Sequence, residues 1–249
     1  MTASPPDHAT AARVPARIQR VIPIDSSLFI TADRLPPGHD WAAVFGRQAP
    51  LSLEIGCGTG HFILERARQQ PAVDFLAIDI YNKGCLKTCR KLEAAGIGNV
   101  RVLRVEAREL LVKACPPQGL QAIYVNCPDP WPKQRHRERR LVNRTFLELT
   151  LHSLAPAGEF YFSSDCRDYA EQVAALLADL PAFRNQLALP FAGALPGYPL
   201  SKYMRRFLDQ GLPVHFIQWR RDPAAPLPTR PELQMCQGFR ARRPGNSDG

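Results

Sequence analysis

The chain has 249 residues, 45% hydrophobic and 22% charged, which is typical of a globular protein and leaves room for one large domain. Its net charge of +9 favours a polyanionic partner, either nucleic acid or an anionic membrane surface. The seven cysteines form no CxxC pair, so neither a zinc site nor a secreted disulfide framework is predicted. No apolar stretch is long enough to span a bilayer and no signal-like region precedes the domain, so we expect a cytoplasmic protein without membrane contact.

The elements expected in chain order alternate between strands and helices. The expected strands are 51–55, 73–80, 100–105, 122–126, 159–163, 183–189 and 212–220, the last two as an antiparallel pair. The expected helices are 61–69, 83–95, 141–154 and 169–180. This order predicts an α/β Rossmann-like fold with a mostly parallel seven-stranded sheet and helices on both faces.

The two ends of the chain differ from this pattern. Residues 1–30 are rich in Ala, Pro and Arg without a sustained period, and we expect a flexible N-terminal arm there, mobile or loosely docked. Residues 221–249 are rich in Pro and Arg and are expected to form a poorly ordered tail. The folded domain is therefore predicted to span residues 31–220.

A glycine-rich turn, Glu54-Ile-Gly-Cys-Gly-Thr-Gly60, joins the first expected strand to the first helix. In such sheets ligands bind beyond the carboxyl ends of the strands, and glycines let a ligand approach the backbone, although a plain chain reversal is the alternative. The spacing is GxGxG, with His61 where a dinucleotide fingerprint has its third glycine. Glu54 places a carboxylate beside the turn, which suits a sulfonium and an amino group better than a pyrophosphate. The turn therefore favours S-adenosylmethionine (SAM) over NAD.

Two further acids follow the next two expected strands. Asp79 ends the second strand, where a carboxylate can accept from both ribose hydroxyls, and a helix N-cap is the alternative. Glu106 follows the third strand and lies either near the adenine or in the solvated first turn of a helix. Together with Glu54, Gly56 and Gly58 these acids predict a SAM pocket.

A rigid loop follows the fourth expected strand. Pro128 and Pro130 flank Asp129 and limit the conformations of that carboxylate, and Trp131 offers a flat face for stacking. The next stretch, 133–140, contains five Lys or Arg residues and one acid, a pattern that suits phosphate binding. The alternative for this stretch is the solvated start of a helix. The arginines expected to contact an RNA backbone are Arg135, Arg137, Arg139 and Arg140.

Over about residues 50–220 the sequence resembles the tRNA (guanine-N7-)-methyltransferase family. The matching residues are the glycine turn 53–60, the loop 128–133, Arg135 and His136, Arg139 to Val142, Ser164 with Asp165, and Tyr169 with Ala170. The resemblance implies cofactor contacts from Glu54, Asp79, Glu106 and Asp129, with Asp129 also the catalytic residue. It further implies nucleotide contacts from Lys133 and Asp165, and a substrate segment at Ser201, Lys202, Tyr203 and Met204.

Three departures from the family pattern affect this site. Asp79 stands where the family usually has Glu, Glu106 stands where it has Asp, and Met204 replaces an acid. A thioether is a weak, uncharged acceptor, so we expect Met204 to weaken or redirect guanine recognition. The alternative is that Met204 packs in the core with the register shifted by a residue or two.

The function expected from these observations is SAM-dependent methyl transfer to guanine N7 in tRNA, by a monomer or homodimer without a metal. Methylation of another base or an amine is one alternative. An RNA-binding protein on a decayed methyltransferase fold is a second, because Met204 and the altered acids depart from the pattern. A NAD-dependent dehydrogenase is a distant last.

Overall fold

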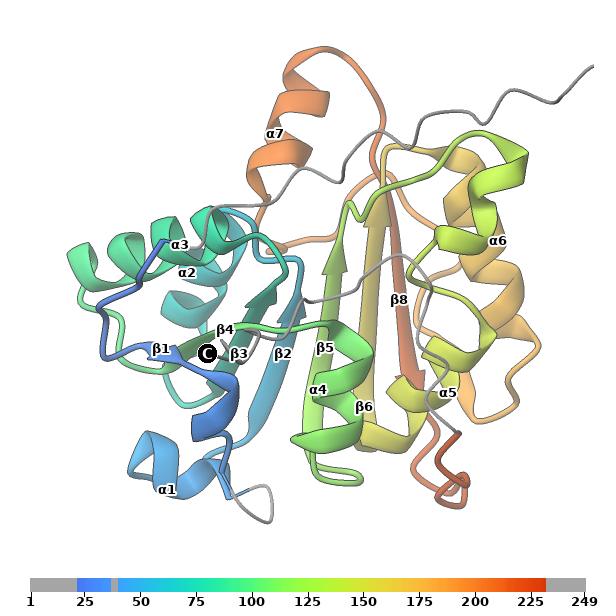
Figure 1. The fold of residues 1–249 in the computed structure, drawn as a ribbon. Coiled ribbons are helices and arrows are strands. Elements are labelled where there is room, and N and C mark those ends of the chain that lie inside the picture. Colours follow the sequence, from blue (N-terminus) through green and yellow to red (C-terminus); the bar gives the residue numbers. More distant parts are fainter. Residues whose placement is uncertain (1–21, 37–39, 232–249) are drawn as a thin grey trace, which may run out of the picture.

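The computed structural model describes residues 22–36 and 40–231, which form one eight-stranded sheet in the order β1-β4-β3-β2-β5-β6-β8-β7 (Figure 1). Strand β8 runs antiparallel to its neighbours β6 and β7, and the other pairs are parallel. The strands are β1 Phe29–Ile30, β2 Leu51–Ile55, β3 Asp74–Asp79, β4 Val100–Arg104, β5 Leu120–Asn126, β6 Leu154–Ser164, β7 Phe183–Asn185 and β8 His215–Arg221. The predicted Rossmann-like, mostly parallel fold is confirmed, with one strand more than expected.

Helices cover both faces of this sheet. They are α1 Trp41–Phe45, α2 His61–Gln69, α3 Asn82–Ala94, α4 Ala107–Lys113, α5 Arg144–Ser153, α6 Arg167–Ala178 and α7 Lys202–Asp209, with 3-10 turns η1 Ala32–Arg34 and η3 Gln134–Arg139. Side chains of β3 alternate between two apolar clusters, because successive strand residues point to opposite faces. Leu76 and Ile78 belong to the cluster that contains α4, α5 and α6 residues, whereas Phe75 and Ala77 belong to the cluster with α2 and α3. No helix of the described ranges is long and apolar enough to cross a membrane.

Of the arm expected over residues 1–30, mobile or loosely docked, residues 22–30 are docked on the domain. Phe29 pairs with Val102 at the sheet edge, and Leu28 is buried. The backbone N–H of Ile22 donates to Asn82 Oδ1 at 2.7 Å. An apolar run at an unpaired sheet edge gains both burial and ladder hydrogen bonds, which explains the docking. The rest of that prediction, residues 1–21, lies outside the described residues.

The start of the predicted tail is likewise attached. Arg221 is the last residue of β8, is almost fully buried and donates to the backbone carbonyl of Leu154 at 2.6 Å. Farther along, the carbonyl of Pro228 lies 3.0 Å from His152 Nδ1, and Arg230 donates to the carbonyl of Val112. Residues 232–249 of the prediction lie outside the described part of the chain.

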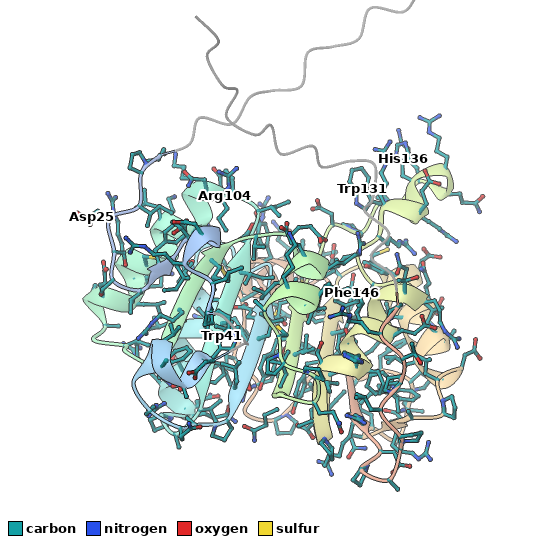
Figure 2. All side chains as sticks on the ribbon, turned by 60° about the horizontal axis from the view of Figure 1, so that its bottom comes forward. Asp25, Trp41, Arg104, Trp131, His136 and Phe146 are labelled. Carbon is teal, nitrogen blue, oxygen red and sulfur yellow. The ribbon has the colours of Figure 1, made fainter. Side chains whose placement is uncertain are left out.

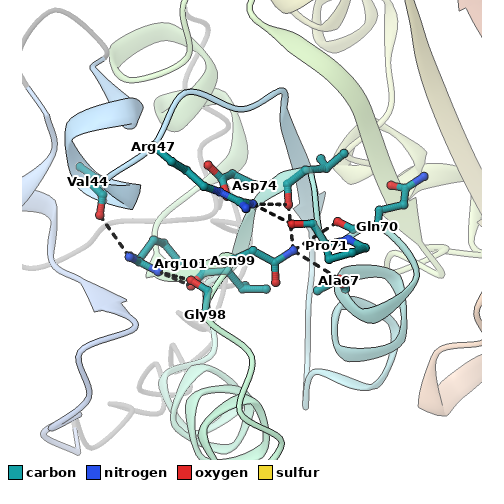
Figure 3. Close-up of polar contacts among 11 residues, drawn as sticks. Val44, Arg47, Ala67, Gln70, Pro71, Asp74, Gly98, Asn99 and Arg101 are labelled. Carbon is teal, nitrogen blue, oxygen red and sulfur yellow. Dashed lines mark hydrogen bonds and ion pairs between the residues drawn. The ribbon is translucent and has the colours of Figure 1, made fainter.

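At the amino ends of the strands, polar side chains tie loops to the sheet (Figure 3). Arg47 forms an ion pair with Asp74 at 2.6 Å, and Asp74 is buried. Asn99 donates to three backbone carbonyls at the end of α2 and the start of β3, and Arg101 reaches the carbonyl of Val44. These groups satisfy carbonyls that the turns leave without partners, so this end of the sheet is closed by hydrogen bonds.

Candidate active site

The glycine turn between β2 and α2 depends on left-handed backbone conformations. Gly56, Gly58 and Gly60 have φ of +78°, +55° and +75°, which L side chains adopt only with strain. The start of α3 approaches the turn so closely that a Cβ on Gly84 would lie 2.6 Å from the Gly58 carbonyl oxygen. The turn is therefore a tight backbone surface at the carboxyl end of β2.

Glu54 lies in the middle of the sheet beneath this turn. Its side chain is about 1% exposed, Oε1 lies 3.5 Å from Asn126 Nδ2, and Oε2 has no hydrogen-bond partner. Burial raises the pKa of Glu54 to about 8, against the opposing effect of the Asn126 hydrogen bond, and the Asp79 charge adds to the increase. A buried carboxylate with an unpaired oxygen is costly unless a cationic donor reaches it. Glu54 therefore fits a ligand that carries an ammonium group.

Asp79 ends β3 beside the turn. Its Oδ2 accepts from the Gly58 N–H at 2.7 Å and its Oδ1 from the Tyr81 N–H at 2.8 Å. Burial raises the pKa of Asp79, and these backbone hydrogen bonds oppose the increase. Tyr81 is the N-cap of α3, so Asp79 is not itself the N-cap that the alternative prediction required. Each carboxylate oxygen keeps a further lone pair that can accept from a hydroxyl.

Glu106 lies at the end of β4 as the N-cap of α4. Its Oε2 accepts from the N–H groups of Arg108 and Glu109 at 2.9 and 3.1 Å. The other oxygen lies 3.7 Å from the Arg108 guanidinium. The carboxylate is thus engaged in capping, close to the first-turn alternative predicted from the sequence, and α4 was missed there because its seven residues carry too short a period.

The loop after β5 is strained around Asp129. Cys127 and Trp131 have φ of +47° and +42°, which is uncommon for residues other than glycine and in other proteins is concentrated at functional sites. Asp129 is exposed between these two residues. Its charge contributes to the raised pKa of Asp79, so the two carboxylates share one edge of the sheet.

Arg140 does not lie on the surface, and the prediction that it contacts the RNA backbone is wrong. The side chain is fully buried, donates to the carbonyl of Pro130 at 2.8 Å and forms an ion pair with Asp168 of α6 at 2.7 Å. Its guanidinium also lies 4.5 Å from the centre of the Tyr169 ring. The sequence could not reveal this, because the partners on α6 are about 30 residues away. Arg140 anchors the loop that carries Asp129.

The other basic residues of the run remain on the surface. Lys133, Arg135 and Arg139 are exposed, and the Arg139 guanidinium lies 5.0 Å from the centre of the Trp131 ring. Arg137 is 41% exposed and shares Asp168 with Arg140. Figure 2 shows His136 on the projecting η3 turn, with Trp131 of the preceding loop beside it. This turn presents cations to solvent next to the strained loop.

The segment Ser201–Met204 starts α7, which stands beyond the carboxyl ends of the strands (Figure 1). Ser201 Oγ accepts from the Met204 N–H at 3.3 Å, and Met204 Sδ receives the Ser201 N–H at 3.3 Å, so Met204 occupies the acid position of a capping box. Met204 is fully buried with Val214 and Phe216, which contradicts the expected substrate contact. Lys202 and Tyr203 are exposed.

Asp165 follows β6 and is half-buried next to Cys127, whose thiol pKa is raised to about 12 mainly by burial and partly by the Asp165 charge. Two polar residues of this edge were missed by sequence reasoning. They are Asn126, which faces Glu54, and Tyr198, whose hydroxyl lies 2.8 Å from Asn126 Oδ1. Nothing in the local sequence around Tyr198 indicates a contact with a strand 72 residues away.

Comparison with known proteins shows to which family the chain belongs. A family model described as "Putative methyltransferase" matches residues 48–217. The tRNA (guanine-N(7)-)-methyltransferase of Syntrophotalea carbinolica is 50% identical over 229 residues, which cover 92% of this chain and 99% of that protein. The chain belongs to the tRNA (guanine-N(7)-)-methyltransferase family. The protein of the same name from Geobacter metallireducens is 49% identical over 205 residues, 82% of this chain and 97% of its own.

The fold is shared more widely. The crystal structure of the 16S rRNA methyltransferase KamB superposes with a TM-score of 0.56 at 17% identity, over 75% of this chain and 94% of that one. The family to which this chain belongs uses SAM as its cofactor. Two features of this chain fit that cofactor. The buried oxygen of Glu54 without a partner can bind the ammonium group of SAM, and the glycine turn, which carries no Cβ at Gly56, Gly58 and Gly60, lets SAM lie against the backbone.

Proposed function

We propose that this chain transfers the methyl group of SAM to N7 of guanine in tRNA. One observation carries the proposal: the buried carboxylate of Glu54, whose Oε2 has no hydrogen-bond partner, lies at the same end of the sheet as the strained loop around Asp129. Membership in the tRNA (guanine-N(7)-)-methyltransferase family supports the choice of substrate.

The residues around the glycine turn would hold the cofactor. Glu54 would accept from its ammonium group, and Gly56 and Gly58 would let it lie against the backbone. Asp79 would accept from the ribose hydroxyls with the lone pairs that its backbone hydrogen bonds leave over. Glu106 would lie near the adenine, with part of its carboxylate already engaged at the start of α4.

When bound, SAM supplies an electrophilic methyl group. Guanine N7 carries a free lone pair, so the protein does not have to remove a proton from it. The protein has two tasks: it aligns the base with the methyl group, and it stabilises the positive charge that develops on the base. Asp129 would do both, because its carboxylate can accept from the guanine N1 and N2 hydrogens. It would also contribute to the cofactor site through its closeness to Asp79.

The RNA would extend from this point over two exposed segments. Lys133 and Asp165 would contact the target nucleotide, and Arg135, Arg137 and Arg139 of the η3 turn would contact phosphates. On the other segment Lys202 and Tyr203 would face the substrate. Ser201 and the buried Met204 would act through the cap of α7 that holds these two residues.

Tritiated methyl transfer from SAM into unmodified tRNA, followed by nucleoside analysis, tests the proposal. The expected product is 7-methylguanosine, and Asp129→Ala should abolish its formation. Asp25→Ala is the matched control, because Asp25 is an exposed acid outside the site. Label in another nucleoside, or none with wild-type protein that binds SAM, would overturn the proposal.

A further inference from the structure

Asn126 ends β5 directly beside Glu54 and is almost fully buried. Its amide oxygen Oδ1 accepts from the Tyr198 hydroxyl at 2.8 Å and from the Ser163 hydroxyl at 3.4 Å. Its amide nitrogen Nδ2 faces Glu54 Oε1 at 3.5 Å. An ionised carboxylate can only accept, so it requires the amide nitrogen on its side, and the two hydroxyls, which can donate or accept, then donate to the amide oxygen on the other side. Tyr198 and Ser163 therefore stabilise the orientation in which Asn126 donates to Glu54.

Tyr198 itself is held firmly. Its ring lies 5.1 Å from the Phe62 ring, 5.5 Å from that of Tyr161 and 5.6 Å from that of Phe216, measured between ring centres. Burial raises the pKa of Tyr198 far above its usual value, so its hydroxyl keeps its proton and can donate. Tyr198 comes from the segment between β7 and α7, three residues before the Ser201 cap of α7.

We propose that Tyr198 is a positioning residue that acts through Asn126 to hold Glu54 ready for the cationic group of the cofactor, an inference that rests on the proposed function. The same residue connects the segment before α7, where the substrate would contact Lys202 and Tyr203, to the cofactor pocket. Movement of that segment would reach Glu54 through a chain of two hydrogen bonds. Tyr198 touches neither ligand in this account.

Loss of the Tyr198 hydroxyl has a defined electrostatic consequence. Asn126 then keeps only the longer hydrogen bond from Ser163, and its amide oxygen can turn toward Glu54. The Asn126 hydrogen bond opposes the rise in the pKa of Glu54, so without it this pKa increases further. The cation of the cofactor binds the ionised carboxylate, and binding therefore becomes weaker near neutral pH.

The test is Tyr198→Phe, which removes the hydroxyl and keeps the ring. The Kd for SAM is measured by calorimetry from pH 6 to pH 9 without tRNA. We expect Kd at pH 7 to rise about 3- to 10-fold, the range for one hydrogen bond, and the midpoint of its pH dependence to move upward. Tyr161→Phe is the matched control, because this neighbouring tyrosine donates to Glu159 and not to Asn126. It should leave both quantities unchanged.

A double-mutant cycle with Asn126→Ala completes the test. If Tyr198 acts through Asn126, Tyr198→Phe adds nothing to Kd in the Asn126→Ala background. Unchanged Kd and midpoint in Tyr198→Phe, a lower melting temperature with an unchanged midpoint, or additive effects in the cycle would each overturn the proposal. The wild type could fail to transfer methyl groups to tRNA while Tyr198→Phe still shows the predicted shifts in SAM binding. That result would overturn only the proposed function.

Discussion

Strand β3 begins with Asp74 and ends with Asp79, and the two acids lie in opposite surroundings. At the amino end, Asp74 is paired with Arg47, and Asn99 satisfies the neighbouring carbonyls. At the carboxyl end, the pKa of Asp79 is raised by burial, and the carboxylate of Glu54 nearby has an unpaired oxygen. Asp74 and its neighbouring carbonyls thus have partners within the protein, whereas Glu54 at the other end keeps an oxygen that a ligand can satisfy.

This difference shows where the protein retains free energy for function. Buried polar groups without partners and residues in left-handed conformations both reduce stability, and Glu54 Oε2, Cys127 and Trp131 place such costs at the end of the sheet where ligands bind in these folds. Paired groups at the amino end increase stability without contacting a ligand. Substitution of paired residues should therefore lower stability, whereas substitution of ligand-binding residues should lower activity or SAM affinity and leave stability intact.

The largest effect on stability should come from Arg140, which lies at the carboxyl end of the sheet but has its hydrogen-bond and ion-pair partners within the protein. Arg140→Ala removes a buried guanidinium, leaves the Pro130 carbonyl without its donor and should cost about 3–5 kcal/mol of unfolding free energy. Urea unfolding measures this value. Arg139→Ala, one residue earlier and exposed, is the control and should leave stability nearly unchanged. Equal stability losses in the two variants would contradict the assignment.

Asp129 should show the reverse signature, with a loss of activity and intact stability. Asp129→Asn keeps the shape of the side chain but removes the charge that would stabilise the methylated base. We expect kcat/KM on unmodified tRNA to fall about 100- to 1,000-fold, as when a single stabilising group is removed from other active sites. Because the side chain is exposed, the melting temperature should stay the same. A large loss of stability would make Asp129 a structural residue.

The two acids of β3 allow the comparison within one strand. Asp79→Ala should weaken SAM binding by about 1.5–3 kcal/mol, the range for hydrogen bonds to charged groups. Asp74→Ala should leave SAM affinity unchanged and lower stability, because Arg47 loses its buried partner. Calorimetry with SAM and thermal unfolding of both variants provide the two measurements. Unchanged SAM affinity in Asp79→Ala would remove Asp79 from the cofactor site.

The smallest effects should come from the exposed cations of the η3 turn. Reversing the charge of Arg135 and Arg139 should reduce the slope of log K against log salt for tRNA binding by about 0.9 for each lost phosphate contact. SAM affinity should not change. Charge reversal of Arg68, an exposed arginine of α2, serves as the control. An unaltered slope in the η3 variant would mean that the turn is only a solvated surface.

The sequence predicted the sheet well because its central strands, such as 51–55 and 122–126, are apolar runs bounded by turns. It also brought Glu54, Asp79 and Asp129 to one edge, since carboxyl ends of parallel strands meet there. Short elements such as β1 and α4 were missed, because so few residues show no period and depend on neighbours for their stability.

Side-chain partners that are distant in sequence were harder to predict. Arg140 and Arg139 are identical in type, and only contacts with α6 distinguish the buried residue from the exposed one. Met204 departs from the family pattern, and its burial gives it a capping and packing role that the sequence alone presented as one alternative. If Met204 weakened guanine recognition, as expected from the sequence, Met204→Glu would increase guanine methylation, whereas the buried position of Met204 gives a reason to expect no gain.

The central claim is that the burial of Glu54 lowers the stability of the protein but provides a binding partner for the cation of the cofactor. The pH dependence of stability and of SAM affinity tests this claim directly. The pKa of Glu54 is about 8 when folded and about 4.3 when unfolded. The folded state thus binds an extra proton between these values, so unfolding free energy without ligand should fall as pH rises through this window. SAM affinity should rise over the same window up to about pH 8, because the cation binds the ionised carboxylate.

The decisive measurement follows both quantities from pH 5 to pH 9 in wild type and in Glu54→Gln, which cannot ionise. The account predicts that the contributions of Glu54 to both pH slopes disappear, that the variant is at least as stable as wild type at pH 8, and that it binds SAM weakly at every pH. A variant that is less stable than wild type at pH 8 and binds SAM with the same affinity and pH dependence would contradict it.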